Sequence, residues 1–102
     1  MIVSVDLKLK NESEFKELVK SKDYQLSKII VNSILRNIDT KDEEIITASI
    51  ELRDEGQILD LKLSRKSFIP TLKENLNNFL KKEDYEGCEQ IKNAIEKLKN
   101  YE

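Results

Sequence analysis

Two runs of alternating apolar and polar side chains occupy the middle of this sequence, with a short polar segment between them. The apolar positions are Ile46, Ala48, Ile50 and Leu52 in the first run and Leu59, Leu61 and Leu63 in the second. A period of two is typical of a strand with one buried face, because successive side chains point to opposite sides of a sheet. Gly56, in the connecting segment, can adopt the positive φ of a short turn. Residues 45–64 are therefore predicted to form a β-hairpin with these apolar positions directed inward.

Another interpretation is open for the first run. Thr40 and Glu43 have the spacing of a capping box, in which two side chains bond to backbone amides at the start of a helix. Residues 41–50 would then begin as a helix. The second strand would lose its partner in that arrangement, so we favour the hairpin.

The N-terminal part predicts a further strand and a helical region. Residues 2–9 alternate, with Val3, Val5, Leu7 and Leu9 on one side. Asn11 is suited to cap a helix, because its side-chain oxygen can accept a hydrogen bond from a first-turn amide. Over residues 12–37 we expect one bent helix or two helices, since Ser21-Lys22-Asp23 interrupts the apolar stripe. The stripe consists of Phe15, Leu18 and Val19 before this interruption and Leu26, Ile30, Ile34 and Ile38 after it.

Two amphipathic segments follow the predicted β-hairpin. Ser67 and Pro70 open the first one, and proline is tolerated in a first helical turn. The apolar positions are Ile69, Leu72, Leu76, Phe79 and Leu80 in the first segment and Tyr85, Cys88, Ile91, Ile95 and Leu98 in the second. This spacing predicts two helices joined by a short turn, which form an antiparallel helical hairpin over residues 67–102.

These elements predict a single α+β domain over residues 1–102, in the order β-α-β-β-α-α. Residues 1–66 would contain the strand, the helical region and the β-hairpin, and residues 67–102 the helical hairpin. A lone β-hairpin is marginal in water, so the first strand should join it. We expect a three-stranded antiparallel sheet with helices packed on one face.

Composition excludes several kinds of chemistry. The chain has no histidine, one cysteine and two glycines. Histidine is the commonest general base and zinc ligand, so catalytic triads and nitrogen–sulfur metal sites are excluded. Two glycines cannot supply a phosphate-binding loop or a dinucleotide fingerprint. We predict a chain that is not an enzyme and that needs no metal or cofactor.

Charge and hydropathy patterns also bear on location. The 18 basic and 20 acidic side chains are interspersed, which gives no extended patch for nucleic acid or a membrane. The first residues lack a basic leader with an apolar core, and no apolar run approaches the roughly 18 residues of a spanning helix. The single cysteine, Cys88, cannot form an internal disulfide. We expect a cytoplasmic protein with no membrane contact.

Three local groups have alternative interpretations. The carboxylates of Asp39, Asp42, Glu43 and Glu44 could hold Mg²⁺, but nothing nearby in the sequence supplies the basic residues that a phosphate substrate needs, and we favour a solvated turn. Lys62, Arg65 and Lys66 could contact phosphate, but the strands carry no aromatic side chains for base stacking. Cys88 lies on an apolar seam, where cysteine behaves as a small hydrophobic residue.

Residues 72–98 carry a pattern found in a known family. Asp84-Tyr85-Glu86 begins the second predicted helix, Gly87 and Cys88 form a small pair, and apolar residues follow at Ile91, Ile95 and Leu98. This arrangement resembles the UVR motif, the helical hairpin of the excision-repair proteins UvrB and UvrC. Lys92 and Asn93 stand where the family usually has Arg and Asp, and Phe79 stands where it often has a smaller residue.

The resemblance implies a surface that contacts other proteins, without catalysis. We therefore expect an interaction module, an adaptor, regulator or assembly subunit, that acts through the C-terminal hairpin, with self-association as one form of contact. The partner-binding residues would be Tyr85, Glu86, Lys92 and Asn93, where the motif is most distinctive. The alternative is a small nucleic-acid-associated protein that uses Lys62, Arg65 and Lys66.

Overall fold

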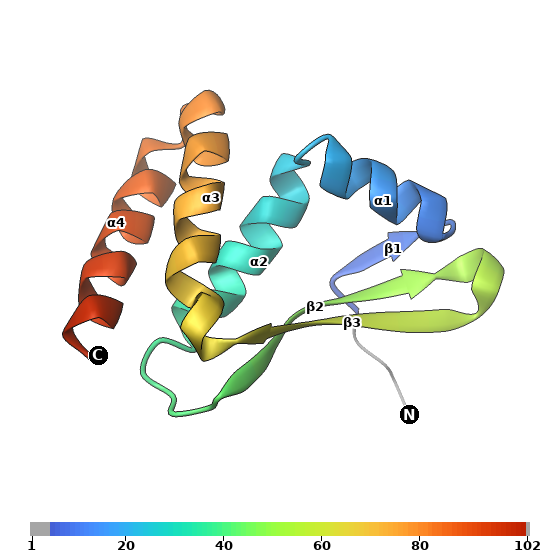
Figure 1. The fold of residues 1–102 in the computed structure, drawn as a ribbon. Coiled ribbons are helices and arrows are strands. Elements are labelled where there is room, and N and C mark those ends of the chain that lie inside the picture. The colour runs from blue at the N-terminus through green and yellow to red at the C-terminus, as the bar shows by residue number, and fades with distance from the viewer. Residues whose placement is uncertain (1–4, 102) are drawn as a thin grey trace.

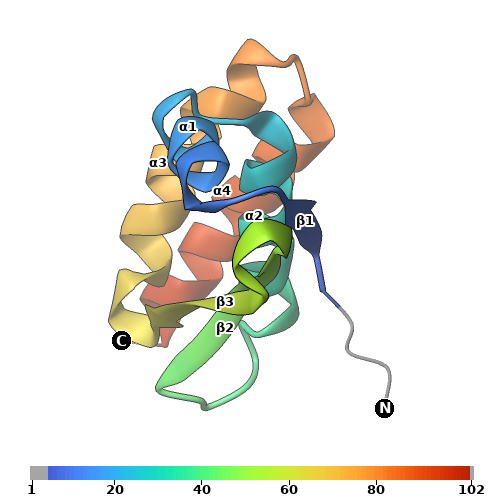
Figure 2. The ribbon, with the colours of Figure 1, turned by 90° about the vertical axis from the view of Figure 1, so that its right-hand side faces the viewer.

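The computed structural model describes residues 5–101 and confirms the α+β class with a C-terminal helical hairpin. The elements are β1 (Leu7–Leu9), α1 (Glu12–Lys20), α2 (Tyr24–Arg36), β2 (Glu44–Leu52), β3 (Gln57–Ser64), α3 (Phe68–Lys81) and α4 (Tyr85–Asn100). The four helices lie on one side of the sheet, and α4 is at the far end of their row (Figures 1 and 2). Within the described part of the chain, no helix combines the length and the apolar content that crossing a bilayer requires.

The predicted β-hairpin is confirmed. Strands β2 and β3 pair antiparallel, from Glu44 opposite Ser64 to Leu52 opposite Gln57. A 3-10 turn at Arg53–Glu55 joins them, and Gly56 follows it in the left-handed region with φ +60°. The helix considered for residues 41–50 is not present, since β2 begins at Glu44.

A β-bulge changes which side chains of β2 face the core. The register shifts between Ile46 and Ala48, so Thr47 is an extra residue relative to β3. As a result Ile45 and Thr47 are buried, whereas Ile46, predicted to point inward, is 51% exposed. The hydroxyl of Ser33, on α2, donates to the Thr47 carbonyl at 2.6 Å, so the carbonyl of the bulged residue has a hydrogen-bond partner. The prediction holds from Ala48 to Leu52 and is wrong at Ile46.

The sheet is mixed, so the antiparallel prediction is wrong for the first strand. The strand order is β1-β2-β3, and β1 pairs with β2 in parallel, with Leu7 opposite Ile50 and Leu9 opposite Leu52. Parallel neighbours need a crossover of about a dozen or more residues. Helices α1 and α2 form that crossover and return the chain so that β2 runs in the same direction as β1 (Figure 1). Positions 2–4 of the predicted first strand lie outside the described residues.

The region left open as one helix or two contains two helices, so the order is β-α-α-β-β-α-α. Asn11 caps α1 as predicted, because its Oδ1 accepts from the Glu14 amide at 3.0 Å. Asp23 caps α2 by accepting from the Leu26 amide at 3.0 Å. Three positions of the predicted helical apolar stripes are wrong: Val19 is 52% exposed, Leu80 is 43% exposed and Tyr85 is 65% exposed.

The core has two parts. One lies between the sheet and helices α1 and α2, and its buried residues are Leu9, Leu26, Ala48, Ile50 and Leu52. The other holds α2, α3 and α4 together around Phe68, Leu72, Phe79, Cys88 and Ile91, among other side chains. Cys88 is 3% exposed, which agrees with its predicted place on the apolar seam. The helical hairpin is thus joined to the rest of the domain mainly through α2.

Candidate functional site

The start of α4 is held by one carboxylate that receives two hydrogen bonds. Asp84 is the N-cap, and its Oδ1 accepts from the Gly87 amide at 2.9 Å. Its Oδ2 accepts from the Tyr24 hydroxyl, which comes from the first turn of α2. The preceding residue, Glu83, has φ +56° in the turn between α3 and α4. Two segments 60 residues apart in the sequence thereby fix the first turn of α4.

Aromatic packing lies directly behind this cap. The Tyr24 ring meets the Phe79 ring edge to face, with centroids 5.2 Å apart and planes at 69°. Gly87 faces the same Phe79 ring so closely that a Cβ at this position would lie 2.5 Å from Phe79 Cδ2. Gly87 therefore allows α4 to approach α3 closely at this point.

Burial and the Asp84 carboxylate raise the pKa of Tyr24 to about 12. In return, the Tyr24 hydroxyl and then the Gly87 amide hold the pKa of Asp84 below its ordinary value, since both donate to the charged form. The Lys28 ammonium lies 5.5 Å from the centroid of the Tyr24 ring and adds a weaker attraction for the carboxylate. The folded chain therefore favours a neutral tyrosine and an ionised aspartate here.

Acid titration of the Asp84 carboxyl should show the effect of its hydrogen bond from Tyr24. Because folding lowers the pKa of Asp84, its stabilisation is present above the ordinary pKa near 4 and is lost as pH falls through the folded value. Replacing Tyr24 by phenylalanine removes the first donor, so the pKa of Asp84 should move up towards its ordinary value. A carboxyl NMR titration of the parent and Tyr24→Phe measures this change.

Asp84→Asn is the matched control for the charge, because asparagine can still cap the helix. The difference in unfolding free energy between the parent and Asp84→Asn should shrink as the pH falls through the folded-state pKa of Asp84. An unshifted carboxyl in the folded parent would show that the Tyr24 hydroxyl does not bond to it in solution.

The four predicted partner-binding residues, Tyr85, Glu86, Lys92 and Asn93, are all exposed on α4. They form two stripes and not one. Positions seven apart lie almost above one another on a helix, so Tyr85 aligns with Lys92 and Glu86 with Asn93. The stripes are about 100° apart around the axis, the rotation of one residue.

The two stripes have different surroundings. Glu86 lines a hollow of about 230 Å³ with Lys28 and Asn32 of α2, and Asn93 lines another of about 320 Å³ with Leu35. The Glu86 and Asn93 stripe therefore borders the seam between α2 and α4. Tyr85 is 65% exposed, the largest fraction among the large hydrophobic side chains that protrude from the described surface.

The predicted basic cluster does not act as one group. Arg65 turns inward to the loop between α2 and β2, where its Nε donates to the Asp42 carbonyl at 2.7 Å and its Nη2 to the Asn37 carbonyl at 2.7 Å. The guanidinium also bonds to the Ile38 and Thr40 carbonyls and lies 4.9 Å from the Phe68 ring centroid. Lys62 and Lys66 are exposed. The structure gives Arg65 a role in holding this loop.

The predicted acidic cluster is also divided. Asp39 Oδ1 lies 2.9 Å from Lys97 Nζ and accepts from the Tyr101 hydroxyl at 2.8 Å, and these contacts lower the pKa of Asp39, Lys97 contributing most. Asp42 contributes its carbonyl to Arg65. Over residues 5–101, no group of three or more carboxylate or thiol side chains is arranged to hold a metal ion.

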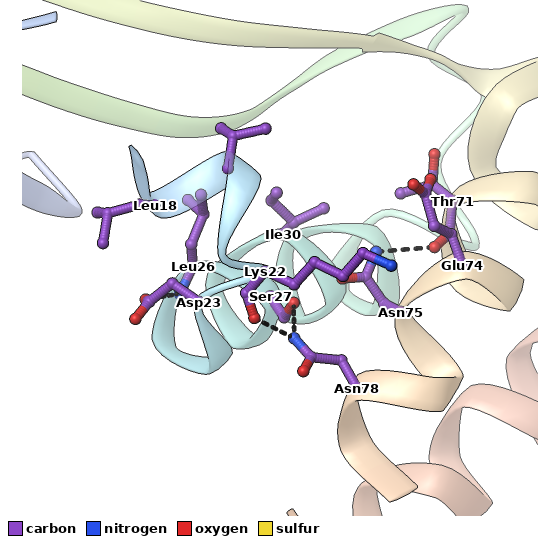
Figure 3. Close-up of a pocket in the computed structure, with 11 residues that line it drawn as sticks. Leu18, Lys22, Asp23, Leu26, Ser27, Ile30, Thr71, Glu74, Asn75 and Asn78 are labelled. Atoms are coloured by element: carbon purple, nitrogen blue, oxygen red, sulfur yellow. Dashed lines mark hydrogen bonds between the residues drawn. The ribbon is translucent and has the colours of Figure 1, made fainter. Parts of the chain in front are cut away.

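A further hollow, of about 190 Å³, lies between the α1–α2 corner and α3 (Figure 3). Leu18, Leu26 and Ile30 form its apolar side. Asn78 of α3 crosses to the corner and donates from Nδ2 to the Lys22 carbonyl at 2.8 Å and to the Ser27 hydroxyl at 2.7 Å. Because these side chains bond within the fold, the hollow is a structural seam between α2 and α3.

Two features of the structure, the bond made by Tyr24 and the structural role of Arg65, are not predicted from the sequence. Tyr24 has no local signal, because its partner Asp84 is 60 residues away in the sequence. Asp84 had one signal: an aspartate before an amphipathic segment is typical of an N-cap. In comparisons with family models, curated proteins and solved structures, no match was found, and the resemblance of residues 72–98 to the UVR motif stays a prediction.

Proposed function

We propose that this chain is a non-catalytic protein-interaction module, an adaptor, regulator or assembly subunit, that binds a protein partner through the outer surface of α4. The observation that carries the proposal is Tyr85, which is 65% exposed beside a fixed helix cap. Tyrosine is enriched in the small set of residues that contribute most of the free energy of binding at protein interfaces. Its ring offers a large contact area and its hydroxyl a hydrogen bond.

The position of Tyr85 supports binding by preorganisation. It directly follows Asp84, whose carboxylate receives bonds from α2 and from the first turn of α4. A backbone that is already fixed loses little conformational entropy when a partner binds. The neighbouring exposed charges, Glu86, Glu89 and Lys92, can form the polar rim that commonly surrounds such an anchor.

The proposal predicts that Tyr85→Ala combined with Lys92→Ala weakens partner binding about tenfold or more while unfolding changes little. Lys92 is an exposed side chain, and surface changes usually alter stability by only about 0.5 kcal/mol. The partner is first captured from the native host with the parent chain and identified. The affinity of the purified pair is then measured by calorimetry for the parent and the variant.

Two further double variants show which surface of the protein contacts the partner. Glu86→Ala with Asn93→Ala tests the stripe that borders α2, and Lys8→Ala with Glu51→Ala alters a cross-strand pair on the outer face of the sheet. If the sheet variant abolished binding and the Tyr85 and Lys92 variant did not, the contact surface would be the sheet, and the proposal would be wrong.

A further inference from the structure

Strand β3 forms one edge of the sheet, and the other side of it has no strand partner among the described residues. The direction in which the backbone N–H and C=O groups of β3 point can be derived from the hydrogen bonds of β2. The Asp6 amide donates to the Ser49 carbonyl at 2.8 Å, so the backbone of Ser49 points towards β1. Its neighbours Ala48 and Ile50 therefore point to β3, opposite Leu61 and Leu59.

Backbone groups alternate in direction along a strand, as they do in β2. Leu59 and Leu61 direct their N–H and C=O groups to β2, so Ile58, Asp60 and Lys62 direct theirs to the open edge. The side chains of Asp60 and Lys62 are exposed, on the face away from the helices. The edge thus offers backbone donors and acceptors at residues that carry opposite charges.

We propose that β3 pairs antiparallel with β3 of a second copy of this chain, centred on Leu61, so that the two sheets form one six-stranded sheet. In this register Asp60 of each copy lies opposite Lys62 of the other, and Ile58 lies opposite Ser64. The backbone groups of Ser64 also point to the open edge, since they alternate in direction with those of Leu63. The inference uses a surface on the sheet and does not rest on the function proposed for α4.

Charge selects this register over its neighbours. The residues whose backbone groups point to the open edge can also pair with the symmetry axis at Asp60 or at Lys62. Those registers place two aspartates or two lysines directly opposite each other, and like charges at opposed positions destabilise a strand pair. Only the register centred on Leu61 gives two opposite-charge pairs. Asp60 and Lys62 lie at equal distances on either side of Leu61, so antiparallel pairing about Leu61 places each aspartate opposite a lysine.

The inner face of β3 fits the same arrangement. Leu59, Leu61 and Leu63 are only partly buried, since β3 has a neighbour on one side alone. In the proposed pairing Leu61 lies opposite Leu61 of the second copy, and Leu59 lies opposite Leu63. Pairing would remove more of this apolar surface from water, which favours association.

The test is charge exchange, measured by sedimentation equilibrium in low salt over a wide range of protein concentration. The parent should approach twice its 11.9 kDa mass as the concentration rises. Asp60→Lys alone and Lys62→Asp alone should each dissociate about tenfold more readily, because both symmetric pairs become repulsive. An equimolar mixture of the two variants should dimerise again, and so should the double variant with both changes, since each restores opposite charges.

A parent that stays monomeric throughout would overturn the proposal, as would dimers that both single variants leave unchanged. Hydrogen exchange of the parent is an independent measurement that needs no variant. The amides of Asp60 and Lys62 should become protected as protein concentration increases, while the Leu61 amide is protected at every concentration. Equal exchange of the Asp60 amide at low and high concentration, in a chain that sediments as a dimer, would also overturn it by placing the interface elsewhere.

Discussion

Replacing Arg65 by alanine should lower the free energy of unfolding by about 3 kcal/mol, the larger of the two stability effects that we expect from single substitutions. The guanidinium donates to the carbonyls of Asn37, Ile38, Thr40 and Asp42, which together fix the loop between α2 and β2. A hydrogen bond that involves a charged group contributes about 1.5–3 kcal/mol. Because Nη2 donates to both Asn37 and Thr40, the contributions of these bonds do not simply add. Urea unfolding of the parent and the variant measures the change.

Two neighbouring substitutions show whether geometry or charge is responsible. Arg65→Lys keeps the charge but loses the planar fork that reaches several carbonyls, so it should still cost about 2 kcal/mol. Lys66→Ala removes an exposed charge beside it and should change stability by only about 0.5 kcal/mol. Equal stability of Arg65→Lys and the parent would mean that the positive charge alone holds the loop.

The elements that could be predicted from the sequence are those whose signals are local. The alternation around Ile50 and Leu61, with Gly56 between the runs, is sufficient for a hairpin, because one short turn brings the two strands together. The helix pair follows from helical spacing and a polar turn, and Asn11 follows from its own capping chemistry. Each of these depends on residues that are close in the chain.

The features that were missed depend on distant contacts. The direction of β1 is set by the path of α1 and α2, and the three residues of β1 carry no signal for it. The bulge at Thr47 lies within a run of three uncharged residues, Ile45 to Thr47, whose sequence allows either side to face inward. Its carbonyl is satisfied by Ser33 on another element, so only the folded chain shows why the bulge is tolerated.

In the candidate site, too, some features follow from the local sequence and others depend on distant contacts. Exposure of Glu86, Lys92 and Asn93 follows from their places beside an apolar seam, whereas Tyr85 has the spacing of that seam and is exposed because it lies in the first turn of α4. Their separation into two stripes also follows from helical geometry, and could have been predicted from the spacing alone. The bond from Tyr24 to Asp84 could not, because only the packing of α2 brings these two distant residues together. Arg65 reaches its loop because the pairing of β2 with β3 places Glu44 opposite Ser64, but which carbonyls it contacts depends on the folded path of residues 37–42.

Replacing Gly87 by alanine should lower the free energy of unfolding by about 2 kcal/mol, although alanine is the better helix former. The new Cβ would lie 2.5 Å from Phe79 Cδ2 and 2.7 Å from Asp84 Oδ2. Phe79 is 4% exposed and packed against Tyr24, and the Asp84 carboxylate is bonded on both oxygens, so neither moves freely. Overpacking costs about 1–3 kcal/mol, and displacement of the Asp84 cap adds about 1 kcal/mol.

Helix propensity acts in the opposite direction and favours alanine by about 1 kcal/mol, so the sign of the measured change decides which effect is larger. Thermal unfolding should show a midpoint about 10 °C lower for Gly87→Ala, given about 4–8 °C per kcal/mol in a domain of this size. Phe79→Leu is the matched second change. If the ring is the obstacle, the double variant should be more stable than the sum of the two single losses predicts, by about 1 kcal/mol or more. A Gly87→Ala chain more stable than the parent would mean that α3 and α4 are farther apart at this point than the cap geometry requires.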